Sequence, residues 1–209
     1  MATMPTAQRE HPLYTIEDYL TLERAAEERH EYLDGCIYAM AGESPDHGRI
    51  CMNLSGSLSA QLRGTSCEAF SKDTKVRCGP TPRLGGSHEG LYAYPDLVVV
   101  CGPLQFHNQV QDVVLNPTVI IEVLSPSTEA FDRGQKFLRY RTWLPTLTDY
   151  VLVAQDQPLV EHAHREEEGT WSLRTLQGLD DRLSVPRIGW TVSLTDVYDR
   201  VVFPHETNA

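Results

Sequence analysis

The chain has 209 residues, with 29 Asp and Glu against 18 Lys and Arg, and a formal net charge of −11. Its longest apolar runs, such as Leu97 to Cys101, are far shorter than the roughly 18 residues that span a bilayer, and its first residues lack the apolar stretch of a secretory signal. The composition therefore excludes membrane, collagen-like and wholly disordered classes, and the acidic balance argues against a surface coated in basic residues for nucleic acid.

The five cysteines predict a reduced, cytoplasmic protein. They are odd in number, no two have CxxC spacing, and small buried thiols are the natural interpretation: Cys36, Cys51, Cys67, Cys78 and Cys101. His162 and His164 alternate in an expected strand and so share a face, which could bind a metal. We favour a solvated strand face beside the acidic turn at 166–168.

The first third of the chain predicts two helices with a hairpin between them. Thr15 followed by Asp18 resembles a helix cap, and helical periodicity continues to about residue 30. Short β-prone runs flank Asp34-Gly35, which is typical of a two-residue hairpin turn. A second helix is expected over 45–63, with apolar residues at helical spacing.

The remainder predicts a mixed sheet with a crossover helix. Strands are expected over 70–78, 93–101, 118–125 and 149–154, and a helix over 129–144; a hairpin over 158–177 and a short helix within 194–203 follow. One α/β (α+β) domain is therefore expected over 14–203, since domains run to roughly 100–200 residues. Residues 1–13 are expected to form a flexible leader and 204–209 a frayed tail.

Two buried-looking strands each carry one acidic residue where the pattern calls for an apolar one. Asp96 begins the run DLVVV directly after Pro95, and Glu122 lies in the middle of VIIEVL. An ionised carboxylate in an apolar strand is costly unless a cation or donors compensate. If the strands are neighbours, both carboxylates can share one divalent cation, and hard oxygen ligands favour Mg²⁺ or Mn²⁺. A strand-end cap for Asp96 and a buried ion pair with an arginine for Glu122 are the structural alternatives.

The helix after the second of these strands offers the other half of a site. Asp132, Lys136 and Tyr140 recur at four-residue spacing and line one face. Lys136 could reach back over Glu122 and hold a phosphate or a metal-bound water. A surface ladder of salt bridges is the alternative for this stripe.

The order of these motifs resembles a known nuclease family. The segments YTIEDYLTLE, EYLDGCIYAM, SPDHGRI, SKDTKVR, PDLVVV, IIEVLSPST, DRGQKFLRY and DYVLV run between about residues 14 and 154. They are similar to the Uma-two family of restriction-endonuclease-like proteins, within the PD-(D/E)xK nuclease superfamily. The resemblance implies a restriction-endonuclease-like single domain, with a mixed β-sheet flanked by helices, N-terminal helices and a C-terminal β-hairpin.

The resemblance also implies a set of site residues. Asp96 and Glu122 match the metal-binding carboxylates, and Glu31, at the end of the first expected helix, matches an acidic ligand from the helical side. Leu124 stands where the superfamily's simplest motif has lysine, and Lys136 on the following helix matches the lysine that takes that role in this family. Lesser or supporting positions are Gln135, His47, Asp73 and Tyr140.

The implied activity is Mg²⁺-dependent hydrolysis of DNA phosphodiester bonds, with Mn²⁺ as a substitute. Two other functions stay open: a non-catalytic interaction or regulatory module that keeps the nuclease fold, and a hydrolase of small phosphoesters. The sequence does not give the oligomeric state, although a homodimer would suit an enzyme that cuts both strands. DNA contacts would rest on basic groups of one helix: Arg133, Lys136, Arg139 and Arg141.

Overall fold

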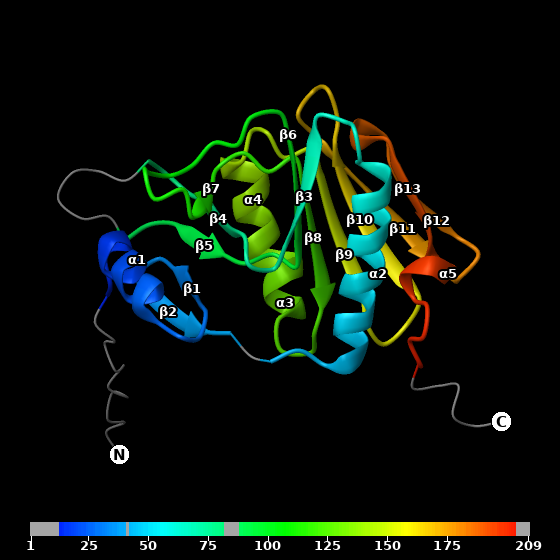
Figure 1. Ribbon diagram of the computed structural model, residues 1–209, viewed down its shortest axis with the longest axis horizontal. Helices are drawn as coiled ribbons and strands as arrows, with labels where there is room; N and C mark the ends of the chain where they lie inside the picture. Colours follow the sequence, from blue (N-terminus) through cyan, green and yellow to red (C-terminus); the bar gives the residue numbers. More distant parts are fainter. Residues whose placement is uncertain (1–12, 41, 82–87, 204–209) are drawn as a thin grey trace, which may run out of the picture.

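The computed structural model describes residues 13–40, 42–81 and 88–203. A six-stranded mixed sheet forms its centre, in the order β11-β10-β9-β8-β6-β3 (Figure 1). The pair β8–β9 is parallel and the other neighbours are antiparallel. The strands are β3 Cys67–Ser71, β6 Leu97–Cys101, β8 Val119–Leu124, β9 Asp149–Ala154, β10 Leu159–Arg165 and β11 Trp171–Gln177. The expected leader and tail lie outside the described residues, apart from Leu13.

A smaller five-stranded sheet lies beside the first, in the order β2-β1-β5-β4-β7. The hairpin between β1 and β2 turns at Asp34 and Gly35, both with positive φ, as the two-residue turn predicted. A further hairpin of β12 and β13 follows β11 and has no counterpart among the sequence predictions. These strands are β1 His30–Leu33, β2 Cys36–Ala39, β4 Lys75–Cys78, β5 Leu91–Ala93, β7 Val113–Val114, β12 Arg182–Val185 and β13 Trp190–Ser193.

Helices cover both faces of the central sheet (Figure 1). On one face α2 packs with the β12–β13 hairpin, and on the other the continuous helix α3-η1-α4 packs with the small sheet. Because both faces of the sheet are covered, every residue of β8 is buried and all but Glu122 are apolar. The helices are α1 Ile16–Ala25, α2 Pro45–Gln61, α3 Glu129–Phe131, the π-helical turn η1 Asp132–Lys136, α4 Phe137–Trp143, the 3₁₀ turn η2 Pro186–Ile188 and α5 Leu194–Val197.

Three of the expected elements differ from the structure. The first helix ends at Ala25, and its predicted last turn is a non-helical segment, bent at Glu27 and Glu28, that leads into β1. The strand expected over 70–78 is two strands in different sheets, joined by a turn after Ser71. The strand expected over 93–101 is likewise divided, because β5 belongs to the small sheet and β6 to the central one. The fold class is confirmed.

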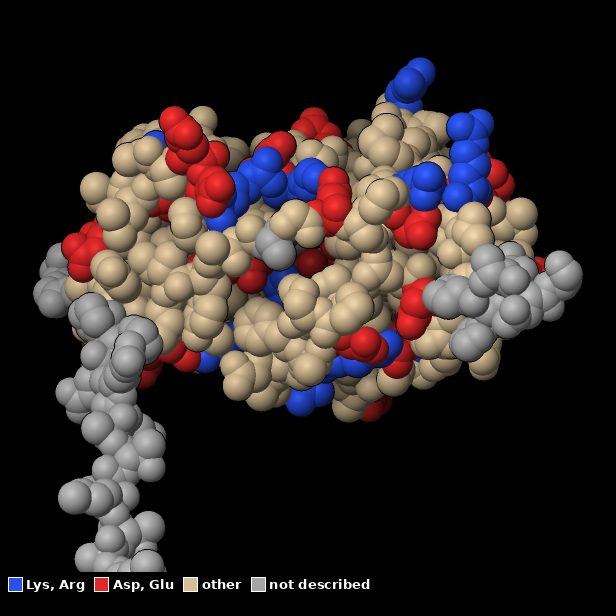
Figure 2. Space-filling model, turned by 90° about the horizontal axis from the view of Figure 1, so that it is seen from below, with Lys and Arg blue, Asp and Glu red and all other residues tan. Residues whose placement is uncertain are grey.

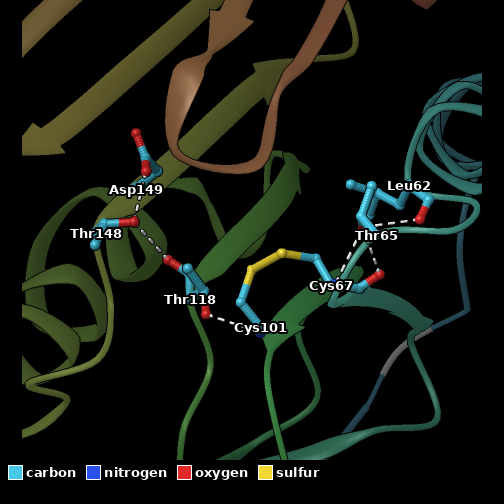
Figure 3. The surroundings of a disulfide bond; sticks show 7 residues. All are labelled: Leu62, Thr65, Cys67, Cys101, Thr118, Thr148 and Asp149. Carbon is cyan, nitrogen blue, oxygen red and sulfur yellow. Dashed lines mark hydrogen bonds between the residues drawn. A yellow bond between two sulfur atoms is a disulfide. The ribbon is translucent and has the colours of Figure 1, made fainter.

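The structure also corrects the prediction of five reduced thiols. Cys67 and Cys101 are direct partners on the antiparallel strands β3 and β6, with Cα atoms 4.0 Å apart, and they form a disulfide (Figure 3). The two residues are 34 positions apart in sequence, so only the strand register shows that they meet. The other three cysteines carry free thiols: Cys36, Cys51 and Cys78.

Candidate active site

Glu122 is a buried carboxylate in the middle of β8. Its side chain shares a face with Ile120 and Leu124, which belong to the core beneath α4, and only 4% of the residue is exposed. Burial raises the pKa of Glu122 well above its ordinary value, because the charged form loses its hydration, and the nearby Lys136 ammonium opposes this shift only in part. The strand therefore holds its carboxylate in an environment that disfavours an uncompensated negative charge.

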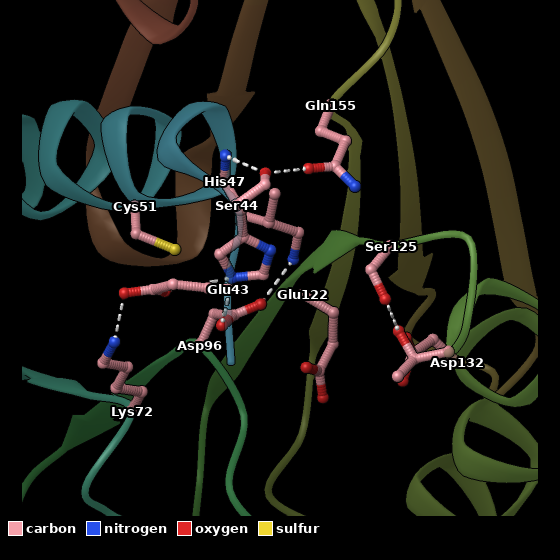
Figure 4. Close-up of polar contacts among 12 residues, drawn as sticks. Glu43, Ser44, His47, Cys51, Lys72, Asp96, Glu122, Ser125, Asp132 and Gln155 are labelled. Atoms are coloured by element: carbon pink, nitrogen blue, oxygen red, sulfur yellow. Dashed lines mark hydrogen bonds and ion pairs between the residues drawn. The ribbon is translucent and has the colours of Figure 1, made fainter. Parts of the chain in front are cut away.

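Asp96 lies directly before β6, where the sheet register brings it opposite Glu122. The antiparallel pairing of Leu97 with Ile121 sets this register. Asp96 Oδ2 accepts a hydrogen bond of 2.7 Å from the backbone N–H of Val123, which fixes the carboxylate against the neighbouring strand. Figure 4 shows the two acidic side chains next to each other, each from its own strand. The two strands are neighbours, so the condition under which both carboxylates could share a cation is met.

Lys136 supplies the cation that faces this strand. Its Nζ lies 2.8 Å from Glu122 Oε1, 3.2 Å from Asp132 Oδ1 and 3.5 Å from Glu31 Oε1. Burial alone would lower the pKa of Lys136, but the charges of Glu122 and Glu31 outweigh it and raise the pKa well above its ordinary value. The ammonium is therefore charged, and it reaches Glu122 as the sequence predicted.

The π-helical turn at 132–136 directs this part of the helix into the core. Asp132, Lys136 and Tyr140 are all buried, with 2%, 4% and 0% of each residue exposed. The turn is fixed to β9, since the Tyr150 hydroxyl donates a hydrogen bond of 3.0 Å to the Asp132 carbonyl. The alternative of a surface salt-bridge ladder is therefore wrong for this stripe. Such π turns are frequent at functional sites.

Glu31 reaches the same lysine from the small sheet. It lies in β1, not at the end of the first helix as predicted, because the helix ends at Ala25 and the chain enters a strand at His30. Its Oε1 accepts a hydrogen bond of 3.1 Å from the backbone N–H of Tyr94. Because β1 pairs with β5, the Glu31 carboxylate lies at the end of β5. That end of the strand is only three residues before Asp96 in the sequence. The prediction that this acidic residue comes from the helical side is therefore wrong, although Glu31 does lie 3.5 Å from the Lys136 ammonium.

His47, at the start of α2, contacts Asp96 from the opposite side. Its Nε2 lies 2.9 Å from Asp96 Oδ1. Burial would lower the pKa of His47, but the hydrogen bond and charge of Asp96, with the charge of Glu43, raise it overall. Glu43, His47 and Cys51 also place one ligand atom each within 4.8 Å of the others (Figure 4). Their four-residue spacing could have indicated Glu43 and Cys51 from sequence, but neither was predicted.

Several predicted supporting residues lie elsewhere. Asp73 is on an exposed turn and pairs with Arg29, so the structure does not bring it to the buried carboxylates. Gln135 is exposed, whereas Lys136 next to it is buried. Tyr140 stays close to the site, but its hydroxyl has no hydrogen-bond partner among the described residues, and it serves there as part of the apolar wall.

The basic residues of this helix do not form a free cationic surface. Arg133 pairs with Glu129 and Glu161, and Arg139 pairs with Asp34. Figure 2 shows acidic and basic side chains interspersed on one face of the molecule, around a hollow with charged side chains at its floor. The expected cluster of four cations is therefore reduced, because Lys136 is buried and two arginines are neutralised locally.

The site holds more buried carboxyl groups than Lys136 alone can pair with. Glu122 Oε1 and Asp132 Oδ1 are buried and accept no hydrogen bond of good geometry from the described residues, although both lie near the lysine ammonium. The carboxylates expected to share one metal are divided, since Glu31 and Glu122 face Lys136 while Asp96 faces His47. Carboxylate oxygens with unused lone pairs, grouped in one cluster, fit a hard divalent cation.

A central mixed sheet with flanking helices and acidic residues at adjoining strands defines a protein with a nuclease-like fold. The chain matches the Uma2 family, described as "Putative restriction endonuclease", over residues 16–195, and it belongs to that family. The fold is shared with a crystal structure of a "putative nuclease belonging to DUF820" from Anabaena variabilis. The two have a TM-score of 0.69 and 17% identity, over 90% of this chain and 99% of that one.

Two relatives from Synechocystis sp. have no described activity. One is 35% identical over 192 residues, which is 92% of this chain and 95% of the relative. The other is 36% identical over 166 residues, covering 79% of this chain and 89% of the relative. Among the residues that the structure describes, no helix is both long and apolar enough to cross a membrane.

Proposed function

We propose that the protein is a metal-dependent endonuclease that hydrolyses phosphodiester bonds in DNA. The observation that carries the proposal is the placement of Glu122 in a buried strand, 2.8 Å from Lys136 and opposite Asp96. A structural ion pair needs only one acid for one base, whereas three carboxylates surround this lysine. Membership of a family described as restriction endonucleases supports a nuclease.

Asp96 and Glu122, with Glu31 as a third donor, would hold Mg²⁺ or Mn²⁺. Their ligand atoms are carboxylate oxygens, which these ions prefer. When bound, the ion supplies Lewis-acid polarisation of the phosphate and a lowered pKa for a coordinated water. His47 and the Val123 N–H hold the Asp96 carboxylate in place, so that its orientation is set before a ligand arrives.

In this proposal, Lys136 acts on the reacting phosphate. Hydrolysis forms one bond from a water oxygen to phosphorus and breaks one phosphorus–oxygen ester bond, while a proton passes to the departing oxygen. Negative charge grows on the phosphate oxygens as this happens. A charged, buried ammonium that is already oriented stabilises that charge without reorganising, and the loss of such a donor typically costs about 10²–10³ in rate.

A cleavage panel tests the proposal. Purified protein is incubated with Mg²⁺ or Mn²⁺ and supercoiled duplex DNA, single-stranded DNA, RNA or a chromogenic phosphodiester. We expect metal-dependent cutting of duplex DNA that falls at least about 10²-fold in Asp96→Asn, Glu122→Gln and Lys136→Met. Glu129→Gln is the matched control, since Glu129 is an exposed acid of the same helical segment and pairs, among the residues that the structure describes, only with Arg133. Unchanged cutting by either acid variant contradicts the assignment.

Two observations favour one other function, an interaction module that keeps the fold without catalysis. Arg133 and Arg139 are paired with acidic side chains of the same chain, and the net charge is −11. Calorimetry separates the two functions. A nuclease should bind Mg²⁺ or Mn²⁺ at millimolar concentration in the wild type and lose that binding in Glu122→Gln. Sedimentation with and without duplex DNA then tests the homodimer that double-strand cutting would favour.

A further inference from the structure

A second group of ligand-type side chains lies on the other face of the central sheet. Asp149 is the first residue of β9, and His164 is its direct partner on β10. Side chains alternate along a strand, so His162 and His164 share the face of Asp149. That face belongs to the core beneath α2 and the C-terminal hairpin, whereas Glu122 belongs to the opposite one. The two groups are therefore separate.

The three side chains converge on one oxygen atom. Asp149 Oδ1 lies 2.7 Å from His162 Nε2 and 2.8 Å from His164 Nδ1, and the three ligand atoms all lie within 4.8 Å of one another. The Thr148 hydroxyl lies 2.7 Å from the other oxygen, Oδ2, and so fixes the carboxylate while leaving Oδ1 to the imidazoles (Figure 3 shows the contact with Thr148). Such outer contacts commonly orient metal ligands.

Burial distinguishes this group from a solvated strand face. The Asp149 side chain is 0% exposed and that of His162 is 9% exposed, so the prediction of a solvated face is wrong for His162. The His164 side chain is 37% exposed, which leaves one side of the group open to solvent. Burial would raise the pKa of Asp149, but hydrogen bonds from His162, Thr148 and His164 outweigh it and lower the pKa, so the carboxylate is ionised.

We propose that Asp149, His162 and His164 form a binding site for a borderline divalent transition metal, with Zn²⁺ as the expected ion. Two imidazole nitrogens and one carboxylate oxygen are a common ligand set for Zn²⁺ and a poor one for Mg²⁺. The open side next to His164 leaves a fourth position for water. A metal held there would link β9 to β10 at the end of the sheet near Cys101 and Thr118. Asp149 pairs with Val119, three residues along β8 from Glu122, and lies on the opposite face of the sheet.

The rival is a purely structural network, in which each neutral imidazole donates an N–H to Asp149. Both arrangements use the same atoms, and they differ in whether a metal displaces the two imidazole protons. The Glu43-His47-Cys51 group could also take up Zn²⁺, so it has to be removed before the measurement. The test therefore uses a parent protein carrying His47→Gln, Cys51→Ser, Asp96→Asn and Glu122→Gln, in which Asp149, His162 and His164 are intact.

Zn²⁺ calorimetry and Co²⁺ absorption spectra of this parent report the site directly. We expect one equivalent of Zn²⁺ and a tetrahedral or five-coordinate Co²⁺ spectrum without a sulfur charge-transfer band. His164→Gln should weaken Zn²⁺ binding at least about 100-fold. His164→Cys should restore binding and introduce the charge-transfer band. His107→Gln, which changes a histidine beside Tyr92, is the matched control and should bind like the parent.

Thermal unfolding in EDTA keeps loss of binding separate from loss of fold. His164 is the most exposed of the three ligands, so its variant should melt within a few degrees of the parent when no metal is present. Added Zn²⁺ should raise the melting temperature of the parent and of His107→Gln but not of His164→Gln. A parent that binds less than half an equivalent, or equal affinity in parent and His164→Gln, overturns the proposal and leaves the structural network.

Discussion

The Lys136 ammonium lies 2.8 Å from Glu122 Oε1, and each of the two side chains is only 5% exposed. The lysine comes from a helix and the acid from a strand, so their meeting depends on the packing of α3-η1-α4 against β8. Glu31 and Asp132 approach the same ammonium. Lys136 thus compensates several buried carboxylates at once, and its loss should affect stability as well as activity.

Lys136→Met should destabilise the protein by about 3–5 kcal/mol, because it leaves buried carboxylates without their cation. Urea unfolding of the wild type and the variant measures this difference. Adding Glu122→Gln to Lys136→Met should recover part of the loss, since one stranded charge is removed. Lys72→Met is the control: Lys72 is 42% exposed and pairs with Glu43, so its loss should cost no more than about 1 kcal/mol. A Lys136→Met protein as stable as the control would show that the cluster is not charged as described.

The pair of Arg24 and Asp112 predicts a pH-dependent contribution to stability. The arginine donates from Nε at 2.8 Å and from Nη2 at 2.9 Å, and this hydrogen bonding lowers the pKa of Asp112 below its ordinary 3.8. A carboxyl group with a lowered folded-state pKa stabilises fully above its unfolded pKa. That stabilisation is lost as the pH falls through the lowered value.

Asp112→Asn should therefore cost up to about 1 kcal/mol at pH 7 and at pH 5, since both side chains are partly exposed. The difference from the wild type should shrink as the pH falls through 3.8, the ordinary pKa at which the unfolded carboxyl protonates, and vanish below the lowered pKa of the folded protein. Denaturant unfolding across this range measures it. Asp199→Asn, at a highly exposed pair with Arg200, should show no comparable difference at any pH. A difference that grows as the pH falls would contradict the sign.

The sequence predicted the strand site better than its surroundings. Glu122 could be predicted because a single acidic residue interrupts an apolar strand. Lys136 could be predicted because it recurs at four-residue spacing with its helical neighbours, which puts it on the same face of the helix. Glu31 was placed on the wrong element, because its segment continues a helical pattern. In the structure the Glu23 carboxylate accepts hydrogen bonds from the His30 N–H and from the Tyr94 hydroxyl, contacts that favour extended chain there. Such long-range contacts have no local signal.

The pairing and register of the strands likewise could not be predicted from the sequence. The single strand expected over 70–78 has suitable residues throughout, yet its two halves pair with β6 and β5 in different sheets. The convergence of Asp149 with His162 and His164 needs the register of β9 and β10, although the shared face of the two histidines followed from alternation alone. Local periodicity therefore predicts which face a side chain occupies, while the partner across the sheet comes from tertiary structure.

The disulfide between Cys67 and Cys101 is the last relationship that only the register shows, and it predicts a labelling pattern. Alkylation of unfolded, unreduced protein should modify three cysteines, and alkylation after reduction all five. Closing a loop of 34 residues should stabilise the oxidised chain by about 3–4 kcal/mol, chiefly by restricting the unfolded chain. Cys67→Ser should lose this difference between oxidised and reduced samples, whereas Cys36→Ser should keep it. Five alkylated cysteines without reductant in protein purified under oxidising conditions would show that the two strands hold free thiols instead.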